Sequence, residues 1–112
     1  MNGAMCTNEA YEQATLENSV GVKHDEGKLE WNLLPDEQLE SVVRVLMHGA
    51  KKYAEENWKK VSHPEVRYYN AARRHIQSWR KGEICDLESG EPHLAHAVCD
   101  LLFLLYFDDI KK

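Results

Sequence analysis

Residues 93–107 are almost entirely apolar, yet they include two histidines and an aspartate. A helix turns by about 100° per residue, so His93, His96 and Asp100 lie within an arc of roughly 60° on one side of such a helix. The other directions are occupied mainly by leucine, alanine, valine and phenylalanine. A helix that is apolar all round is usually buried, and buried polar groups need partners. The segment therefore predicts a core helix with a functional site along one stripe.

Two more helices are expected upstream of this one. Pro35 is a helix-start signal with acidic residues in the following turn, Ser62 and Glu65 have the spacing of a capping box, and Gly82 is suited to a helix end. Apolar residues recur at helical spacing between these signals. The predicted helices cover residues 35–57, 62–81 and 92–110. The sequence thus predicts an all-α fold, with a flexible N-terminal arm (1–22) and one helical domain (23–112).

Composition excludes several classes of function. A chain of 112 residues with a formal net charge of -5 fits a single domain that does not bind polymeric nucleic acid, which would require a basic surface. Three cysteines without a CxxC motif indicate reduced thiols. No signal peptide is recognisable, and the apolar run is too short to span a bilayer. We expect a soluble cytoplasmic protein without a membrane partner.

The loop before the last helix concentrates carboxylates. Clustered carboxylates repel each other unless they are solvated or bridged by a cation, so the loop is either a flexible acidic loop or a metal site. We favour the metal site because the loop leads directly into His93. Oxygen ligands favour Mg²⁺ or Mn²⁺, and Mn²⁺ tolerates imidazole better. The candidate metal ligands are Glu83, Asp86, Glu88, His93, His96 and Asp100.

A carboxylate or a histidine near such an ion can take the proton from an attacking water. The candidates for this catalytic role are Glu83, Asp86, Glu88 and His96.

Cationic side chains could hold a phosphorylated substrate. Arg67, Arg74 and Lys81 share one face of the second predicted helix, and Lys52 lies near the end of the first. Lys23 and Lys28 flank a glycine turn and could also reach a phosphate, although a solvated loop is an equal alternative. The chain has no GxxxxGK[ST] phosphate loop. The residues alone favour a metal-dependent hydrolase of a small phosphorylated molecule.

Three alternatives stay open. Cys85, His93, His96 and Cys99 could hold a structural zinc ion, although their spacing is not that of a usual zinc finger. The chain could instead be a non-catalytic helical module that binds a nucleotide or a protein. The pair Glu37 and Glu40 could ligate metal, but a solvated first helical turn explains it better.

Three runs of sequence resemble a known family. GKLEWNLLP, HGAKKYAEENW and AARRHIQSWRKGEICDLESGEPHLAHAVCDLLFLL, within residues 23–105, are similar to the phage dATP/dGTP diphosphohydrolases. The most specific part is RH-x₇-E-x₂-D-x-E-S-G-x₂-HLAHA. The resemblance implies a MazG-like all-α bundle completed by homo-oligomerisation. It also implies hydrolysis of dGTP or dATP to the monophosphate and pyrophosphate, in the host cytoplasm, linked to the supply of 2-aminoadenine for phage DNA.

The resemblance also implies site residues, including positions that spacing alone does not single out. Among these, Asn57, Trp58 and His75 would bind substrate. The full set carried over is Lys52, Asn57, Trp58, Arg74, His75, Glu83, Asp86, Glu88, His93 and His96. In one respect the chain departs from the MazG-like pattern of ExxE followed by ExxD on successive helices. Its one ExxD, Glu83 to Asp86, falls near a helix end, and His96 and Asp100 occupy the third-helix positions of the expected carboxylate pair.

Overall fold

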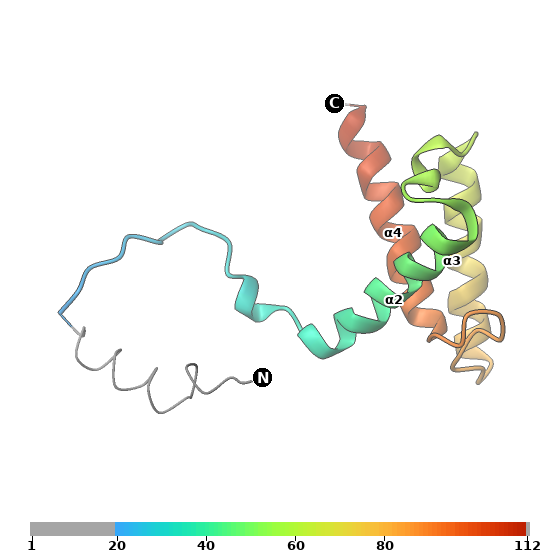
Figure 1. Ribbon diagram of the computed structural model, residues 1–112, viewed down its shortest axis with the longest axis horizontal. Coiled ribbons are helices and arrows are strands. Elements are labelled where there is room, and N and C mark those ends of the chain that lie inside the picture. The colour runs from blue at the N-terminus through green and yellow to red at the C-terminus, as the bar shows by residue number, and fades with distance from the viewer. Residues whose placement is uncertain (1–19, 112) are drawn as a thin grey trace. The chain divides into compact units, whose positions relative to one another are not determined.

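The computed structural model describes residues 20–111 (Figure 1). The chain divides into two units, Met1–Trp31 and Asn32–Lys112. In the first unit, residues 21–25 have no regular secondary structure. The predicted arm (1–22) lies mostly outside the described residues, so the arm and the domain boundary stay predictions.

The second unit is helical. Its α-helices are α2 (Asp36–Tyr53), α3 (Pro64–Arg80) and α4 (His93–Ile110), and it contains the short 3-10 turn η3 (Asn57–Lys60). Another 3-10 turn, η2 (Trp31–Leu33), begins at the last residue of the first unit. Helix α4 packs against both α3 and α2 (Figure 1). Across residues 20–111 there is no β-strand, only an isolated bridge between Cys85 and Pro92. The all-α prediction is confirmed.

The helix ends differ from the prediction in two places. Helix α2 stops at Tyr53 rather than near residue 57, because Ala54 and Glu56 have φ angles of 117° and 58°. Such positive values leave the helical region. The predicted capping box at the start of α3 is also wrong, since His63 is the N-cap residue and no side chain caps the helix. Gly82 does end α3 as expected, with a φ of +104° and its amide donating to the Trp79 carbonyl at 2.9 Å.

The core between α2 and α4 is small. Val42 and Val45 pack with Ala95 and Cys99, and the Cys99 thiol donates to the Val42 carbonyl at 3.5 Å. Aromatic rings extend this packing toward the end of α4. Trp58 stacks on Phe103 with ring centroids 4.4 Å apart, and other contacts join Tyr68, Tyr106 and Phe107 to this group. The aromatic cluster holds the segment after α2 against α3 and α4.

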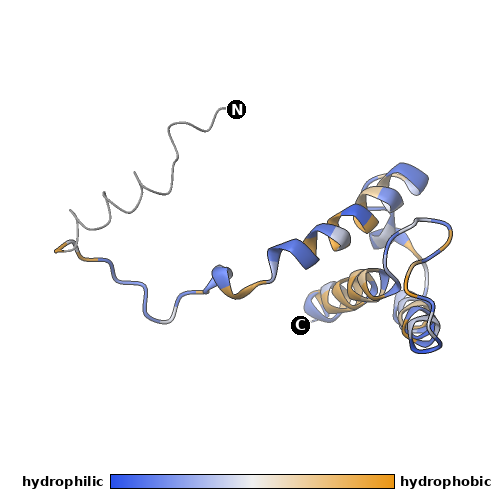
Figure 2. Ribbon diagram, turned by 90° about the horizontal axis from the view of Figure 1, so that it is seen from below, coloured by the Kyte–Doolittle hydropathy of each residue, from blue (hydrophilic) through white to orange (hydrophobic). Residues whose placement is uncertain are grey.

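Helix α4 is buried on one side only, so the prediction of a fully buried helix is wrong for a single chain. Its polar stripe and its small residues are covered, but Leu94, Val98, Leu101 and Leu105 are 41%, 38%, 53% and 56% exposed. Apolar residues recur along its whole length (Figure 2). Two neighbouring helices cannot cover the full circumference of a third. Among the helices of residues 20–111, none is both long and apolar enough to cross a membrane.

Candidate functional site

The polar side of α4 opens into a cavity of about 980 Å³. All three helices and the loop between α3 and α4 contribute to its lining. Most of the residues predicted to form the site lie here. They are Lys52, Asn57, Trp58, Arg67, Arg74, His75, Asp86, Glu88, His96 and Asp100.

Glu83 and His93 do not line the cavity but are hydrogen-bonded to each other next to it. Lys23 and Lys28 belong to the first unit, so their proposed contact with phosphate stays a prediction. Lys81 is the exposed C-cap of α3 and is absent from the cavity wall, so the cationic face contributes only Arg67 and Arg74.

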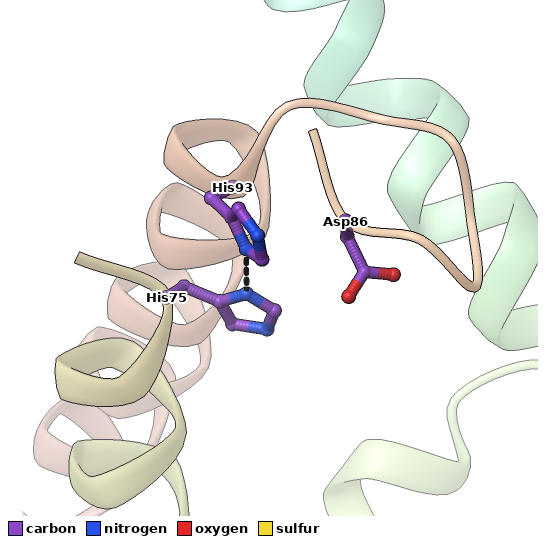
Figure 3. A group of neighbouring side chains, drawn as sticks. All are labelled: His75, Asp86 and His93. Atoms are coloured by element: carbon purple, nitrogen blue, oxygen red, sulfur yellow. Dashed lines mark hydrogen bonds between the residues drawn. The ribbon is translucent and has the colours of Figure 1, made fainter. Parts of the chain in front are cut away.

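The most concentrated group of potential metal ligands combines two histidines with an aspartate (Figure 3). His75 comes from α3, Asp86 from the loop and His93 from the first position of α4. One ligand atom of each lies within 4.8 Å of the others, and the two Nδ1 atoms are 2.9 Å apart. The sequence predicted Asp86 and His93 as metal ligands, whereas the resemblance implied that His75 binds substrate.

Hydrogen bonds fix the roles of the ring nitrogens in this cluster. The carboxylate of Glu83 can only accept, so His93 Nε2–H donates to it at 2.6 Å. In neutral His93 the Nδ1 lone pair then accepts from His75 Nδ1–H, which leaves the lone pair of His75 on Nε2. Burial, aided by the charges of His96 and His93, lowers the pKa of His75 to about 4. His75 is therefore a neutral imidazole with one free lone pair at neutral pH.

Ser89 connects Asp86 to His96. Its Oγ accepts the Glu91 amide at 3.1 Å, so its hydroxyl hydrogen is available for His96 Nε2 at 2.6 Å. Its own amide donates to Asp86 Oδ2 at 2.9 Å, and that oxygen lies 3.8 Å from His96 Nε2. The His96 ring stacks on His75 at 4.5 Å. The sequence did not predict Ser89 as a site residue, because a single serine in a turn is common and only the structure shows its hydrogen bonds to Asp86 and His96.

The protonation states in this part of the site follow from burial and hydrogen bonds. Burial raises the pKa of Asp86, but the hydrogen bonds from Ser89 and the charge of His96 outweigh it, so the pKa lies below its usual range. Burial lowers the pKa of His96 more than Asp86 raises it. The arrangement therefore places an ionised carboxylate beside imidazoles that favour the neutral form, which suits both metal ligation and proton transfer.

Asp100 lies deeper, on the same stripe of α4. Its residue surface is only 8% exposed, and burial raises its pKa to about 7 despite the nearby charge of Arg74. Asp100 and Arg74 line the same cavity. A carboxyl group with this pKa is available in both protonation states near neutral pH.

Glu88 is paired away from the histidine–aspartate cluster. Its Oε2 accepts from Lys52 Nζ at 2.5 Å and lies 3.5 Å from His48 Nε2. A second contact joins the loop to α2, where Arg44 Nε contacts both carboxylate oxygens of Glu91 at 3.1 Å. His48 was also missed, although its spacing of four residues from Lys52 puts both on one helix face.

The structure does not support the two alternative metal sites, the zinc site with Cys85 and Cys99 and the pair Glu37 and Glu40. Cys85 is exposed, while Cys99 is buried with a pKa raised to about 12, so it resists forming the thiolate that zinc requires. Within the described part of the chain, the one group of three or more close ligands is His75, Asp86 and His93. Glu37 and Glu40 lie on exposed positions of the first turns of α2, as a solvated pair would.

Comparison with known proteins gives two matches. The family described as "dATP/dGTP diphosphohydrolase, N-terminal" matches residues 18–112. A protein of Salmonella phage PMBT28, named dATP/dGTP diphosphohydrolase, is 35% identical over 87 residues. This alignment covers 78% of the chain but only 29% of that relative. No solved structure matches the chain.

Proposed function

Because the chain belongs to the dATP/dGTP diphosphohydrolase family, matching its N-terminal region, we propose that it hydrolyses a purine deoxynucleoside triphosphate with a divalent metal ion. The products are the monophosphate and pyrophosphate. One observation carries this proposal: a single cavity joins two arginines, Arg67 and Arg74, to the carboxylate and histidines around Asp86. The arginines would bind the negative charge of a polyphosphate, and the carboxylate and histidines would assist attack by water at phosphorus.

The residues present fit a metal ion. Two nitrogens bound at right angles at ~2.1 Å from an ion lie ~3.0 Å apart, and the Nδ1 atoms of His75 and His93 are separated by 2.9 Å. Ligation through both Nδ1 atoms requires the His75 proton to move from Nδ1 to Nε2, so the cation would replace the hydrogen bond between the two rings. A metal-binding histidine usually donates its other N–H to a carboxylate, as His93 does to Glu83. We assign His75, Asp86 and His93 as ligands and Glu83 as the residue that orients His93. When bound, Mg²⁺ or Mn²⁺ supplies polarisation of the phosphoryl group and a lower pKa for water.

The chain's own residues supply proton transfer and charge neutralisation. We assign His96 as the group that takes the proton from the attacking water, since burial lowers its pKa and keeps the ring neutral. Its Nε2 lone pair accepts from the Ser89 hydroxyl in the free protein and would accept the water proton in its place. Arg67 and Arg74 neutralise the charge that develops on the departing pyrophosphate. Asp100, beside Arg74, limits how strongly this arginine binds the substrate before reaction.

The nucleoside part of the substrate would lie toward η3. Asn57 and Trp58 line this part of the cavity, with Tyr68 next to them. Phe103 stacks on Trp58, and Lys59 Nζ also lies over this ring, 5.5 Å from its centroid, so a base would contact the edge of Trp58 or displace the Lys59 side chain. Asn57 offers both a donor and an acceptor for the base or the sugar.

The biological setting proposed for the reaction is phage nucleotide metabolism. The similar protein from a Salmonella phage supports this setting. The link to 2-aminoadenine DNA, the MazG-like type of bundle and the homo-oligomer are proposed from the family resemblance together with the exposed leucines of α4.

Product analysis tests the proposed reaction. The 112-residue chain is incubated with dGTP or dATP and Mn²⁺ or Mg²⁺, and the products are separated by anion exchange. Monophosphate with pyrophosphate is expected. Nucleoside with inorganic triphosphate would replace the proposed reaction by a triphosphohydrolase, and unchanged substrate would favour a non-catalytic binding module.

A further inference from the structure

The carboxylate of Glu88 lies where an anionic ligand of the cavity would lie. It accepts from Lys52 Nζ at 2.5 Å and lies 3.5 Å from His48 Nε2. Lys52, His48 and Glu88 all line the cavity that also contains Arg67 and Arg74. The Lys52 ammonium, which donates, and the His48 ring on the same face of α2 thus approach one carboxylate oxygen, as they would approach a phosphate oxygen.

We propose that His48 and Lys52 form a phosphate subsite that Glu88 occupies in the free protein and that the substrate's polyphosphate takes over. The identity of the ligand as a polyphosphate rests on the proposed function. The subsite itself rests on the contacts of Glu88. In this assignment Glu88 is a competitor of the substrate and neither a metal ligand nor a catalytic residue.

The ion pair is exchangeable because it is exposed. The side chains of Glu88 and Lys52 are 58% and 41% exposed, and ion pairs at such positions contribute little to stability. A polyphosphate carries several negative charges and can contact Arg67 and Arg74 in the same cavity. The exchange therefore replaces one weak contact by several.

The rest of the loop is held independently of Glu88. Glu91 keeps its contact with Arg44, the Asp86 amide donates to the Glu91 carbonyl at 2.9 Å, and the His93 amide donates to the Ile84 carbonyl at 2.8 Å. Next to Glu88, Leu87 is 89% exposed and anchors nothing. The Glu88 side chain can leave Lys52 while the histidine–aspartate cluster keeps its geometry.

Removing the charge of Glu88 distinguishes the two roles: pyrophosphate binding should become tighter if Glu88 competes with the substrate, whereas kcat should fall if Glu88 is a metal ligand. Glu88→Gln frees Lys52 and His48, so inorganic pyrophosphate should bind roughly two- to fivefold tighter than to the wild type, as expected for loss of one competing exposed charge. Lys52→Gln should weaken binding by about the same factor. The double variant should bind only slightly more tightly than Lys52→Gln, because without Lys52 the Glu88 carboxylate competes only at His48, its longer contact.

Isothermal titration of the full chain with inorganic pyrophosphate measures these affinities, and circular dichroism checks the fold of each variant. Glu65→Gln is the matched control, because it removes a similarly exposed carboxylate that contacts Lys111 instead of Lys52, and its affinity should equal that of the wild type. In turnover of dGTP, Glu88→Gln should lower KM with little change in kcat.

Unchanged or weaker pyrophosphate binding by Glu88→Gln would overturn the subsite, as would a kcat reduced by orders of magnitude. The titration needs no turnover. A chain that shows the expected affinities without hydrolysing dGTP would keep the subsite and lose the proposed function.

Discussion

At the scale of single residues, burial and hydrogen bonds control the protonation of the site. His75 has a pKa of about 4, and Asp86 stays ionised because Ser89 donates to it. His93 is 4% exposed and is oriented by Glu83. Asp86 lines the cavity whereas Glu83 contacts His93 beside it, and we propose that the two carboxylates have different roles for this reason.

Carboxylate substitutions separate these roles. Asp86→Asn should reduce turnover of dGTP by orders of magnitude, because it removes a proposed ligand. Glu83→Gln should cost less, about 10- to 100-fold, the usual effect of losing a residue that orients a ligand. Both variants should keep the circular dichroism spectrum of the wild type. An equal loss for both would make Glu83 a ligand in its own right.

Asp100 should make stability depend on pH. Its pKa is about 7 in the folded chain against an ordinary value of 3.8, so the unfolded chain releases the proton first as the pH rises. The stabilisation is fully present below about pH 4 and is lost as the pH rises toward 7. At about 1.4 kcal/mol per pKa unit, the loss for this buried group is on the order of 2–4 kcal/mol.

Urea unfolding at several pH values, on the wild type and on Asp100→Asn, measures this effect. The neutral amide cannot titrate, so the variant should lack this part of the pH dependence. Parallel curves for the two proteins would show that Asp100 titrates in the folded chain much as it does in the unfolded chain.

At the scale of elements, α3 and α4 approach closely through small residues. Ala72 on α3 is 3% exposed and Ala97 on α4 is 4% exposed, so little space remains for larger side chains. This packing positions His75 on α3 opposite His93 at the start of α4. The spacing of the two helices therefore controls the geometry of the site.

Ala97→Leu should destabilise the fold by about 1–3 kcal/mol through overpacking. The control is Gln77→Leu, which adds a similar side chain at an exposed position of α3. Denaturant unfolding compares the two variants. A wild-type midpoint for Ala97→Leu would mean that α3 and α4 can separate at little cost.

The sequence predicted those features of the helices that depend on neighbouring residues in the chain. Apolar spacing located all three helices, and Gly82 marked the end of α3. The break at Ala54 and the cap at His63 could not be found, because positive φ angles at non-glycine residues are imposed by the surrounding structure. The same holds for the site, where residues close in sequence could be grouped from the sequence and distant ones could not. Asp86 and His93 stand in one loop-helix segment, whereas the contact of His75 with His93 joins positions 18 residues apart.

At the scale of the whole molecule, α4 has an uncovered apolar side. Leu94, Val98, Leu101 and Leu105 are spaced by three or four residues and form one stripe, as in helices that pair with another helix. We predict that a second copy of the chain covers this stripe. Light scattering at micromolar concentration should give twice the 13.0 kDa of one chain.

The double substitution Leu101→Glu and Leu105→Glu should convert this dimer into a folded monomer, because both positions are more than half exposed in the single chain. A wild-type mass of one chain would contradict the prediction.

The central claim, metal-dependent hydrolysis at the histidine–aspartate cluster, is tested most directly by one rate measurement. The chain is treated with a chelator, and the initial rate of dGTP hydrolysis is followed as Mn²⁺ is added back. The account predicts no turnover without metal, recovery with Mn²⁺ in the wild type, and no recovery in Asp86→Asn. Full activity of the chelator-treated wild type would contradict it.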